Sequence, residues 1–219
     1  MTDNPTTDEL RDGYDAVAEE YIDRIFNELD HKPLDRELLD RFATRVGAGT
    51  CCDLGCGPGH VARYLRSRGA NVVGIDLSPL MIERARQLNP GIEFRQGDMR
   101  LPSPDNEEWA GVVGFYSIIH VPREQVTSVL ENLRRSLRAD GLLLISFHLG
   151  QGTTHMDEWW GKKVSLDFHF FERDEMEGYL RAAGFDIEET VERAPYEGFE
   201  YPSHRAYIFA TRRREGNRH

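Results

Sequence analysis

Residues 51–59 read Cys51-Cys52-Asp53-Leu54-Gly55-Cys56-Gly57-Pro58-Gly59. A short apolar run here ends in an acid and passes at once into a loop with three glycines. Because glycine adopts positive φ at little cost, such a loop can bring its backbone close to a ligand. Free N–H groups at the start of a following helix favour an anionic group. The stretch predicts a strand, a ligand-binding turn and a helix, although a glycine pattern alone also occurs in dinucleotide-binding enzymes.

Outward from this loop, short apolar runs alternate with amphipathic stretches. This alternation predicts a parallel sheet covered by helices on both faces. No helix is expected between the last two strands, which predicts a closing hairpin and an antiparallel edge. The fold class is therefore α/β: a doubly wound, Rossmann-like, mostly parallel seven-stranded sheet with an antiparallel last strand. We expect strands at 50–54, 71–76, 91–95, 111–118, 141–148, 185–192 and 204–211, and helices near 58–68, 79–88, 122–138 and 173–183.

Two amphipathic helices are expected before the sheet. Thr6, Thr7 and Glu9 offer a capping-box start. Pro33 opens the second helix and Gly47 ends it. The apolar side chains of the first helix recur at three- and four-residue steps on one face, at Leu10, Tyr14, Ala18, Tyr21, Ile25 and Leu29.

The length of 219 residues suits one sizeable α/β domain. Within it we expect N-terminal lid helices in 1–47, a cofactor-binding core in 48–149, and a substrate-side lid with the C-terminal strands in 150–219. No sequence feature indicates the oligomeric state, so the protein is expected to be either a monomer or a homodimer.

Composition narrows the classes of partner. The formal charge of -11 argues against nucleic acid, whose binding depends on Lys and Arg contacts to phosphates. The basic cluster Arg212–Arg214 is more simply a solvated terminus. No run of 18 apolar residues exists, and the polar, acidic N-terminus lacks the features of a signal peptide, so we expect no membrane partner and a cytoplasmic location.

All three cysteines lie within the quoted stretch, at Cys51, Cys52 and Cys56. Adjacent residues of a strand point to opposite faces, so Cys51 and Cys52 cannot ligate one ion together. There is no CxxC pair. We expect small buried residues in a reducing compartment, and no metal.

An aspartate stands at the end of each of the first three expected strands. Asp53 would repel a pyrophosphate but attract an ammonium or a sulfonium. Asp76 ends NVVGID, 23 residues later, and can accept hydrogen bonds from both ribose hydroxyls. Asp98, in QGDM, can meet an adenine amine, with Met99 beside the ring. Singly each could be a turn residue; together they favour a positively charged adenosyl ligand.

These motifs resemble the class I S-adenosylmethionine-dependent methyltransferase family, especially its small-molecule members of the ubiquinone/menaquinone-biosynthesis type. The resemblance runs from Tyr14 to Thr211. One departure is Trp109-Ala110-Gly111, where many relatives have Phe-Asp, and it affects sheet packing more than the cofactor. The matching stretches are the Tyr14-Asp15-x-x-Ala18-x-x-Tyr21 lid helix, DLGCGPGH at 53–60, GIDLSPLMIERAR at 74–86, FRQGDM at 94–99, YSIIHVP at 116–122, LRADGLLLISF at 137–147 and AAGF at 182–185.

The resemblance implies S-adenosyl-L-methionine as cofactor, with S-adenosyl-L-homocysteine as its product. Tyr14 and Tyr21 would close over it, although core packing alone also explains a tyrosine on this stripe. His120 can equally be a structural histidine. The implied contacts are Asp53, Gly55, Cys56, Gly57 and Gly59 for the methionine part, Asp76 for the ribose, Leu77, Met81, Gly97, Asp98 and Met99 for the adenine, and Tyr116, Ser117 and His120 for the sulfonium.

The acceptor side should come from the segments outside these motifs, 148–172 and 193–204. A connection as long as 148–172 is more often a functional lid than an idle loop. Its aromatic residues fit a partly apolar pocket, but an apolar plug on the sheet would have the same composition. We expect the substrate pocket to include His155, Trp159, Trp160, His169, Phe170 and Tyr196.

A general base helps when the acceptor is a hydroxyl or an ammonium, and neutral histidine suits this role near pH 7. His148 at the end of the fifth strand is the first candidate, with His155 and His169 behind it, and His120 is a second, tentative catalytic residue. The predicted function is in-line methyl transfer to a small molecule. Two rivals stay open: an NAD-dependent oxidoreductase, which gives no reason for Asp53 or Asp98, and a non-catalytic S-adenosylmethionine-binding protein.

Overall fold

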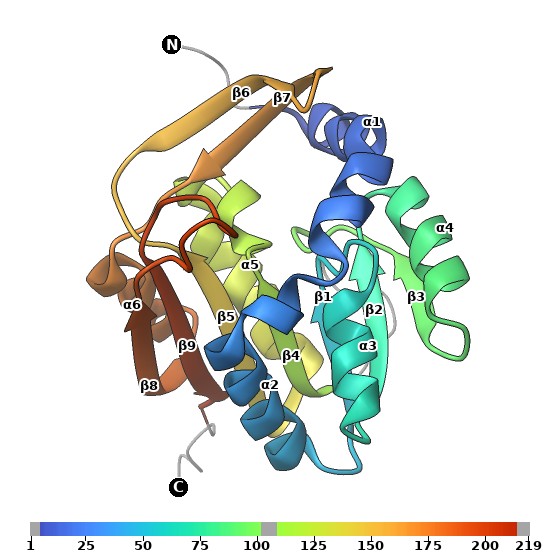
Figure 1. Cartoon of the computed structure of the whole chain (residues 1–219). Coiled ribbons are helices and arrows are strands. Elements are labelled where there is room, and N and C mark those ends of the chain that lie inside the picture. Colours follow the sequence, from blue (N-terminus) through green and yellow to red (C-terminus); the bar gives the residue numbers. More distant parts are fainter. Residues whose placement is uncertain (1–4, 102–108, 214–219) are drawn as a thin grey trace, which may run out of the picture.

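The computed structural model describes residues 5–101 and 109–213, and Arg214 of the basic cluster lies outside them. A seven-stranded sheet with the order β3-β2-β1-β4-β5-β9-β8 forms the centre of the molecule (Figure 1). Neighbouring strands from β3 to β5 pair in parallel, and β9 runs antiparallel to both β5 and β8. This confirms the predicted fold class. The strands are β1 (Thr50–Leu54), β2 (Asn71–Asp76), β3 (Glu93–Gln96), β4 (Trp109–Phe115), β5 (Leu137–His148), β8 (Phe185–Arg193) and β9 (Arg205–Arg212).

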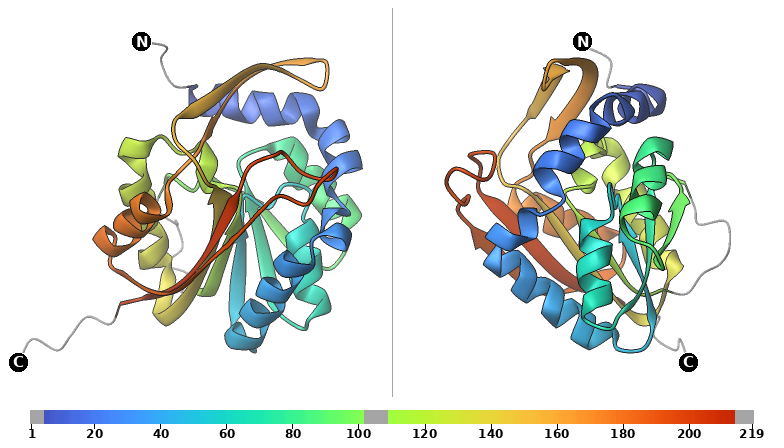
Figure 2. Two further views of the ribbon diagram at one scale, coloured as in Figure 1. Left: turned by 60° about the vertical axis from the view of Figure 1, so that its left-hand side comes forward. Right: turned by 45° about the vertical axis from the view of Figure 1, so that its right-hand side comes forward.

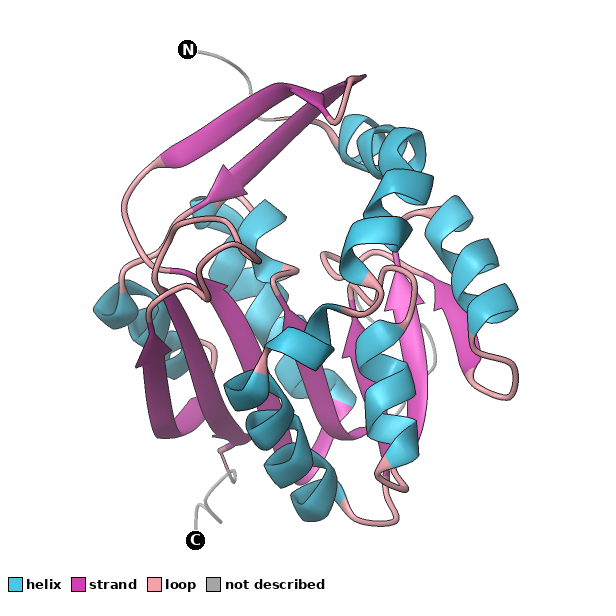
Figure 3. Cartoon of the chain, viewed as in Figure 1, coloured by secondary structure: helices cyan, strands magenta, loops and turns pink. Residues whose placement is uncertain are grey.

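Helices pack on both faces of the sheet (Figure 2 and Figure 3). Along β5, Leu142 and Leu144 join one buried cluster while Leu143 and Ile145 join the other, because successive side chains of a strand point to opposite faces. Cys51 and Cys52 divide in the same way, as predicted. One cluster includes residues of α2 (Pro33–Val46), α3 (His60–Ser67) and α4 (Pro79–Leu88), and the other includes residues of α5 (Arg123–Ser136) and α6 (Arg173–Ala182).

The last strand of the chain, β9, is antiparallel as predicted, and with β8 it forms the expected hairpin at one edge of the sheet. β9 lies between β5 and β8, and β8 forms the edge. The reason is visible in the two sequences: Ala206 to Ala210 of β9 are all buried, whereas β8 reads FDIEETVER and carries acidic side chains. Charged residues and a bulge between Ile187 and Glu189 suit an edge that must not pair further.

The N-terminal helices begin where the sequence predicts. Thr6 caps α1 (Thr7–Ile25) in a capping box with Glu9, Pro33 opens α2, and Gly47 follows its end. Leu29, expected on the stripe of the first helix, falls instead in a short 3-10 helix, η1 (Glu28–His31). Among the helices that the structure describes, none has the length and apolar character needed to cross a bilayer.

The expected connection 148–172 contains a β-hairpin, β6 (Thr153–Trp159) and β7 (Lys162–His169). It stands above the sheet beside α1 (Figure 1), and Leu166 of β7 and Val17 of α1 are both fully buried there. Trp160 and Gly161 have positive φ, the conformation that a two-residue hairpin turn requires. The alternation of Val164, Leu166 and Phe168 was the available sequence signal for β7.

Candidate functional site

The glycine loop after β1 is held against the end of β2. Gly55, Gly57 and Gly59 have φ of 71°, 50° and 81°, a region that residues with a Cβ seldom adopt. The N–H of Gly57 donates to Asp76 Oδ2 at 2.8 Å, and the N–H of Ser78 donates to Oδ1 at 2.9 Å. Asp76 therefore fixes the loop and the start of α4 at the same time, and its side chain still lines the adjacent cavity.

Two acids in this region, the buried Asp53 and the half-buried Asp76, have no cationic partner within the described residues. Asp53 is 2% exposed and accepts a hydrogen bond from the N–H of Ala62 at 2.9 Å. Burial raises the pKa of Asp53 to about 7, and burial also raises the pKa of Asp76. A negative potential without a paired cation is the environment that a positively charged ligand would relieve.

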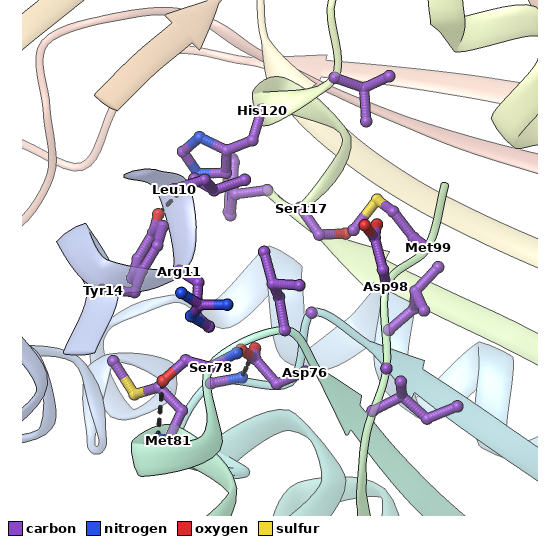
Figure 4. A pocket seen from close by; sticks show the side chains of 18 of the residues that line it. Leu10, Arg11, Tyr14, Asp76, Ser78, Met81, Asp98, Met99, Ser117 and His120 are labelled. Carbon is purple, nitrogen blue, oxygen red and sulfur yellow. Dashed lines mark hydrogen bonds between the residues drawn. The ribbon is translucent and has the colours of Figure 1, made fainter. Parts of the chain in front are cut away.

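A narrow cleft of about 90 Å³ runs along the carboxyl ends of β1, β2 and β4 beneath α1 (Figure 4). Asp98 faces it from the segment after β3 and pairs with Arg100, whose Nε lies 2.9 Å from Asp98 Oδ1. Thirteen of the residues predicted to contact a cofactor line this cleft: Tyr14, Tyr21, Gly55, Gly57, Asp76, Leu77, Met81, Gly97, Asp98, Met99, Tyr116, Ser117 and His120.

The other three predicted cofactor residues lie elsewhere. Asp53 and Cys56 line the cavity next to the cleft. Gly59 lines neither cavity, and it caps the N-terminus of α3, where a Cβ would lie 2.7 Å from the ring of Phe94. The third glycine of the loop thus serves helix packing, a role that the sequence pattern does not distinguish from ligand contact.

A larger chamber of about 630 Å³ adjoins the cleft. The two cavities share Tyr14, Tyr21, Gly55, Gly57, Phe115 and Tyr116, so they meet at the loop after β1 and the end of β4. Aromatic side chains dominate the chamber wall. The predicted pocket residues Trp159, Trp160 and Phe170 are among them, together with Phe168, Phe199 and Tyr201.

Three predicted pocket residues are not part of that wall. His155 is exposed on β6 and pairs with Asp167, while His169 is buried and bonded to Thr153. Strand alternation explains both: Thr154, Met156, Phe168 and Phe170 face the chamber, so the residues between them face away. The hydroxyl of Tyr196 instead accepts the N–H of Leu34 at the start of α2.

The two candidate catalytic histidines lie on different cavities. His148 lines the chamber, stacks on Tyr116 with ring centroids 5.1 Å apart, and places Nδ1 2.7 Å from Ser203 Oγ. His120 lines the cleft and bonds through Nε2 to the hydroxyl of Tyr14 at 2.6 Å. Burial lowers the pKa of each to about 4, so both rings are neutral near pH 7.

Several residues that line the cleft or the chamber were not predicted from the sequence. Leu10 and Arg11 of α1 border the cleft. Glu28 and Lys32 line the chamber as a 2.7 Å ion pair, and His60 lies 3.2 Å from Glu28. For His60, its position directly after the glycine loop was a sequence signal that it lies near the site. The other four residues come from the segment around α1 and η1, and only the fold reveals the position of this segment over the sheet.

Residues 51–141, which carry β1 to the start of β5, match the family model of a methyltransferase domain. Within these residues the chain is similar to the methyltransferase family. The chain is 36% identical over 112 residues to a trans-aconitate 2-methyltransferase of Azoarcus sp. (strain BH72), a match that covers 50% of this chain and 43% of that protein. It is 34% identical over 95 residues to a malonyl-[acyl-carrier protein] O-methyltransferase of Serratia marcescens, covering 43% of this chain and 36% of that one.

The chain therefore spans less than half the length of these relatives. Solved structures extend the likeness in fold to almost the whole chain. The DhpI–SAH complex aligns with a TM-score of 0.74 and 21% identity, over 94% of this chain and 97% of DhpI. The CcbJ methyltransferase from Streptomyces caelestis aligns with a TM-score of 0.72 and 15% identity, over 94% and 99%.

Proposed function

We propose that this protein transfers the methyl group of S-adenosylmethionine to a small-molecule acceptor. One observation carries the proposal: Asp76 and Asp98 line one cleft, Asp53 borders the chamber beside it, and the glycine loop lies between Asp53 and Asp76. A cluster of carboxylates at the carboxyl edge of a parallel sheet suits an adenosyl ligand that carries positive charge. An NAD-dependent oxidoreductase gains no support from the methyltransferase domain match.

The residues present fit S-adenosylmethionine. The carboxyls of the buried Asp53 and the half-buried Asp76 have raised pKa values, which a cationic ligand would lower again. We propose that Asp76 holds the ribose and Asp98 with Met99 the adenine, while Asp53, Cys56 and the loop hold the methionine part. The cleft also offers apolar walls for a ring at Leu77 and Met81.

When bound, S-adenosylmethionine supplies an electrophilic methyl group on a sulfonium. The chain then has to position the acceptor in line and exclude water, which accounts for large rate gains without acid–base chemistry. Tyr14 and Tyr21 stand at the junction of cleft and chamber and restrict access to it. Trp159 and Trp160 of the hairpin, stacked 4.4 Å apart, add apolar wall on the acceptor side.

We propose His148 as a catalytic residue that contacts the acceptor within the chamber. Its Nδ1 is committed to Ser203, and Nε2 has no hydrogen-bond partner within 5–101 and 109–213. A neutral imidazole with one free nitrogen can bind or deprotonate an acceptor group. The acceptors named for the relatives are not carried over to this chain, because it spans less than half of those proteins.

Calorimetry with S-adenosylhomocysteine and with NAD tests the proposal. We expect micromolar or tighter binding of S-adenosylhomocysteine and none of NAD. Release of S-adenosylhomocysteine from S-adenosylmethionine should then increase when suitable small molecules are added. Binding of NAD alone would refute the assignment, and firm cofactor binding without turnover in a broad acceptor screen would favour a non-catalytic role.

A further inference from the structure

Tyr14 stands where the cofactor cleft meets the acceptor chamber. It comes from α1 and lines both cavities, so its side chain borders whatever passes between them. Its hydroxyl lies 2.6 Å from His120 Nε2, a contact that Figure 4 draws across the top of the cleft. His120 belongs to a short 3-10 helix after β4, η2 (Ile118–His120), so the bond joins α1 to the end of the sheet.

The direction of this hydrogen bond follows from the other nitrogen of the ring. His120 Nδ1 lies 2.9 Å from the backbone carbonyl oxygen of Asp167 in β7. A carbonyl oxygen can only accept, so Nδ1 carries the proton. Burial keeps the pKa of His120 near 4, and the ring is neutral near pH 7. Nε2 therefore has a lone pair, and the Tyr14 hydroxyl must be the donor.

With its proton committed, the Tyr14 oxygen offers only lone pairs to the junction. His120 is the one hydrogen-bond partner of this hydroxyl within 5–101 and 109–213. A hydroxyl or an amine that enters the junction can donate to this oxygen. A carboxylate cannot, because it brings lone pairs against lone pairs, and an oxygen acceptor facing another acceptor is unfavourable.

We propose that the methyl-accepting atom of the substrate carries a hydrogen, as in a hydroxyl or an amine, and donates it to Tyr14 Oη. This inference rests on the proposed methyl transfer and narrows its substrate class. A lone pair of the acceptor atom forms the bond to the methyl carbon, while the carbon–sulfur bond breaks and its electron pair stays on sulfur. The acceptor's proton moves to Tyr14 as the Tyr14 proton moves to His120 Nε2, so Tyr14 is a catalytic residue and His120 the terminal base.

The resulting imidazolium would donate to Tyr14 from Nε2 and to the Asp167 carbonyl from Nδ1, so both of its N–H groups keep partners. A buried imidazolium with two good acceptors is less costly than an unpaired one. The pair thus provides a defined proton route at the junction, separate from His148 in the chamber.

Sinefungin tests the hydrogen bond without any acceptor, because this cofactor analogue carries an amino group in place of the methyl-bearing sulfonium. We expect Tyr14→Phe to weaken sinefungin binding about tenfold, the scale of one hydrogen bond to a charged group. S-adenosylhomocysteine has no donor at that place, so its affinity should change less than twofold. Tyr179→Phe, which removes a hydroxyl bonded to Glu175 outside both cavities, is the matched control and should alter neither affinity.

Equal losses for the two ligands, or no loss for sinefungin, would overturn the role of Tyr14 while leaving the proposed function intact. Failure of the unaltered protein to bind S-adenosylhomocysteine would instead sink the proposed function. Phenol, benzylamine and benzoate form a matched second arm, read by release of S-adenosylhomocysteine. Methylation of the hydroxyl or the amine supports the inference, and methylation of benzoate alone overturns it. If none of the three compounds is methylated, the inference is judged by the loss of sinefungin affinity in Tyr14→Phe relative to the loss of S-adenosylhomocysteine affinity.

Discussion

The carboxylate of Asp76 both holds the glycine loop in place and lines the cleft. It accepts the N–H groups of Gly57 and Ser78, and it lines the cleft. We expect Asp76→Ala to weaken S-adenosylhomocysteine binding roughly 10- to 100-fold, since charge-assisted hydrogen bonds to the ligand and the tie on the loop are lost together. Calorimetry measures the dissociation constant. An unchanged value would remove Asp76 from the binding site.

His148 should separate catalysis from cofactor binding. Its imidazole lines the chamber but not the cleft, and it stacks on Tyr116 between them. We predict that His148→Ala lowers turnover by roughly 10²-fold or more, the usual scale for general acid–base catalysis, with little change in S-adenosylhomocysteine affinity. Steady-state kinetics and calorimetry on one preparation give both numbers. Parallel losses in turnover and affinity would assign His148 a folding role.

We predict that the buried carboxyl of Asp53 lowers the stability of the ligand-free protein. Its folded-state pKa of about 7 is raised above the value of about 3.9 expected when unfolded. The stability linked to a raised carboxyl pKa is present below the unfolded value and is lost as pH rises through the folded value. Asp53→Asn keeps an acceptor for the Ala62 N–H but removes this titration.

We therefore expect the ligand-free Asp53→Asn protein to exceed the unaltered protein in unfolding free energy by roughly 4 kcal/mol at pH 8. The two should be nearly equal near pH 4, where the aspartic acid is also neutral. Urea titrations at both pH values measure the difference, and S-adenosylmethionine binding should weaken in the variant. A difference that does not depend on pH would show that the carboxyl of Asp53 titrates normally.

At the scale of elements, α1 and the β6–β7 hairpin form a cover above the carboxyl edge of the sheet. The two lie side by side in each view (Figure 2), with Val17, Val164 and Leu166 buried between them. Tyr14 adds the bond to His120, and Ser78 donates its hydroxyl proton to Asp15. Because this buried cluster is small, we expect the cover to open without unfolding of the sheet.

The variant Leu166→Ala tests whether α1 and the hairpin open independently of the sheet. Removing a fully buried leucine typically costs about 2–5 kcal/mol. We expect this cost to appear as faster amide exchange in α1 and the hairpin, with exchange in the central strands little changed. Leu130→Ala in α5, equally buried beneath the sheet, is the comparison that should speed exchange globally. Uniform acceleration in the Leu166 variant would mean that cover and sheet form one cooperative unit.

At the scale of the whole molecule, a buried ionic network joins the N-terminal helices to the C-terminal strands. Arg193 of β8 pairs with Asp35 of α2 at 2.9 Å and with Glu200 at 2.6 Å. Lys32 lies 3.1 Å from the same Glu200. Hydrogen bonds from Arg193 and the nearby cations lower the pKa of Glu200 to about 2, so this carboxylate is ionised in the folded protein despite its burial.

Arg193→Gln should be strongly destabilising, by about 3–5 kcal/mol, because it leaves buried carboxylates with too little compensating charge. Arg213→Gln is the matched control: it removes an exposed pair with Asp186, worth about 0–1 kcal/mol. Chemical denaturation at pH 7 compares the two. Similar small losses in both variants would show that water reaches the network around Glu200.

The sequence by itself determined the strand order along the chain, the glycine loop, the helix caps at Thr6 and Ser78, and the three strand-end aspartates. These are local features, set by backbone preference and by the periodicity of apolar residues within a few positions. They sufficed to predict the seven-stranded sheet and most of the cleft lining. Gly59 and three residues of the pocket prediction line neither cavity, because the position of each depends on which neighbour packs against it.

Only the tertiary structure decided which residues line the chamber and which atoms carry the protons where the chamber meets the cleft. Tyr14 and His120 are 106 positions apart, and the Asp167 carbonyl that fixes the tautomer lies on a strand of the unforeseen hairpin. Such contacts depend on the docking of separate elements, which leaves no periodic trace in the chain. Local chemistry thus specified most residues of the cleft, whereas long-range packing specified the arrangement of the chamber.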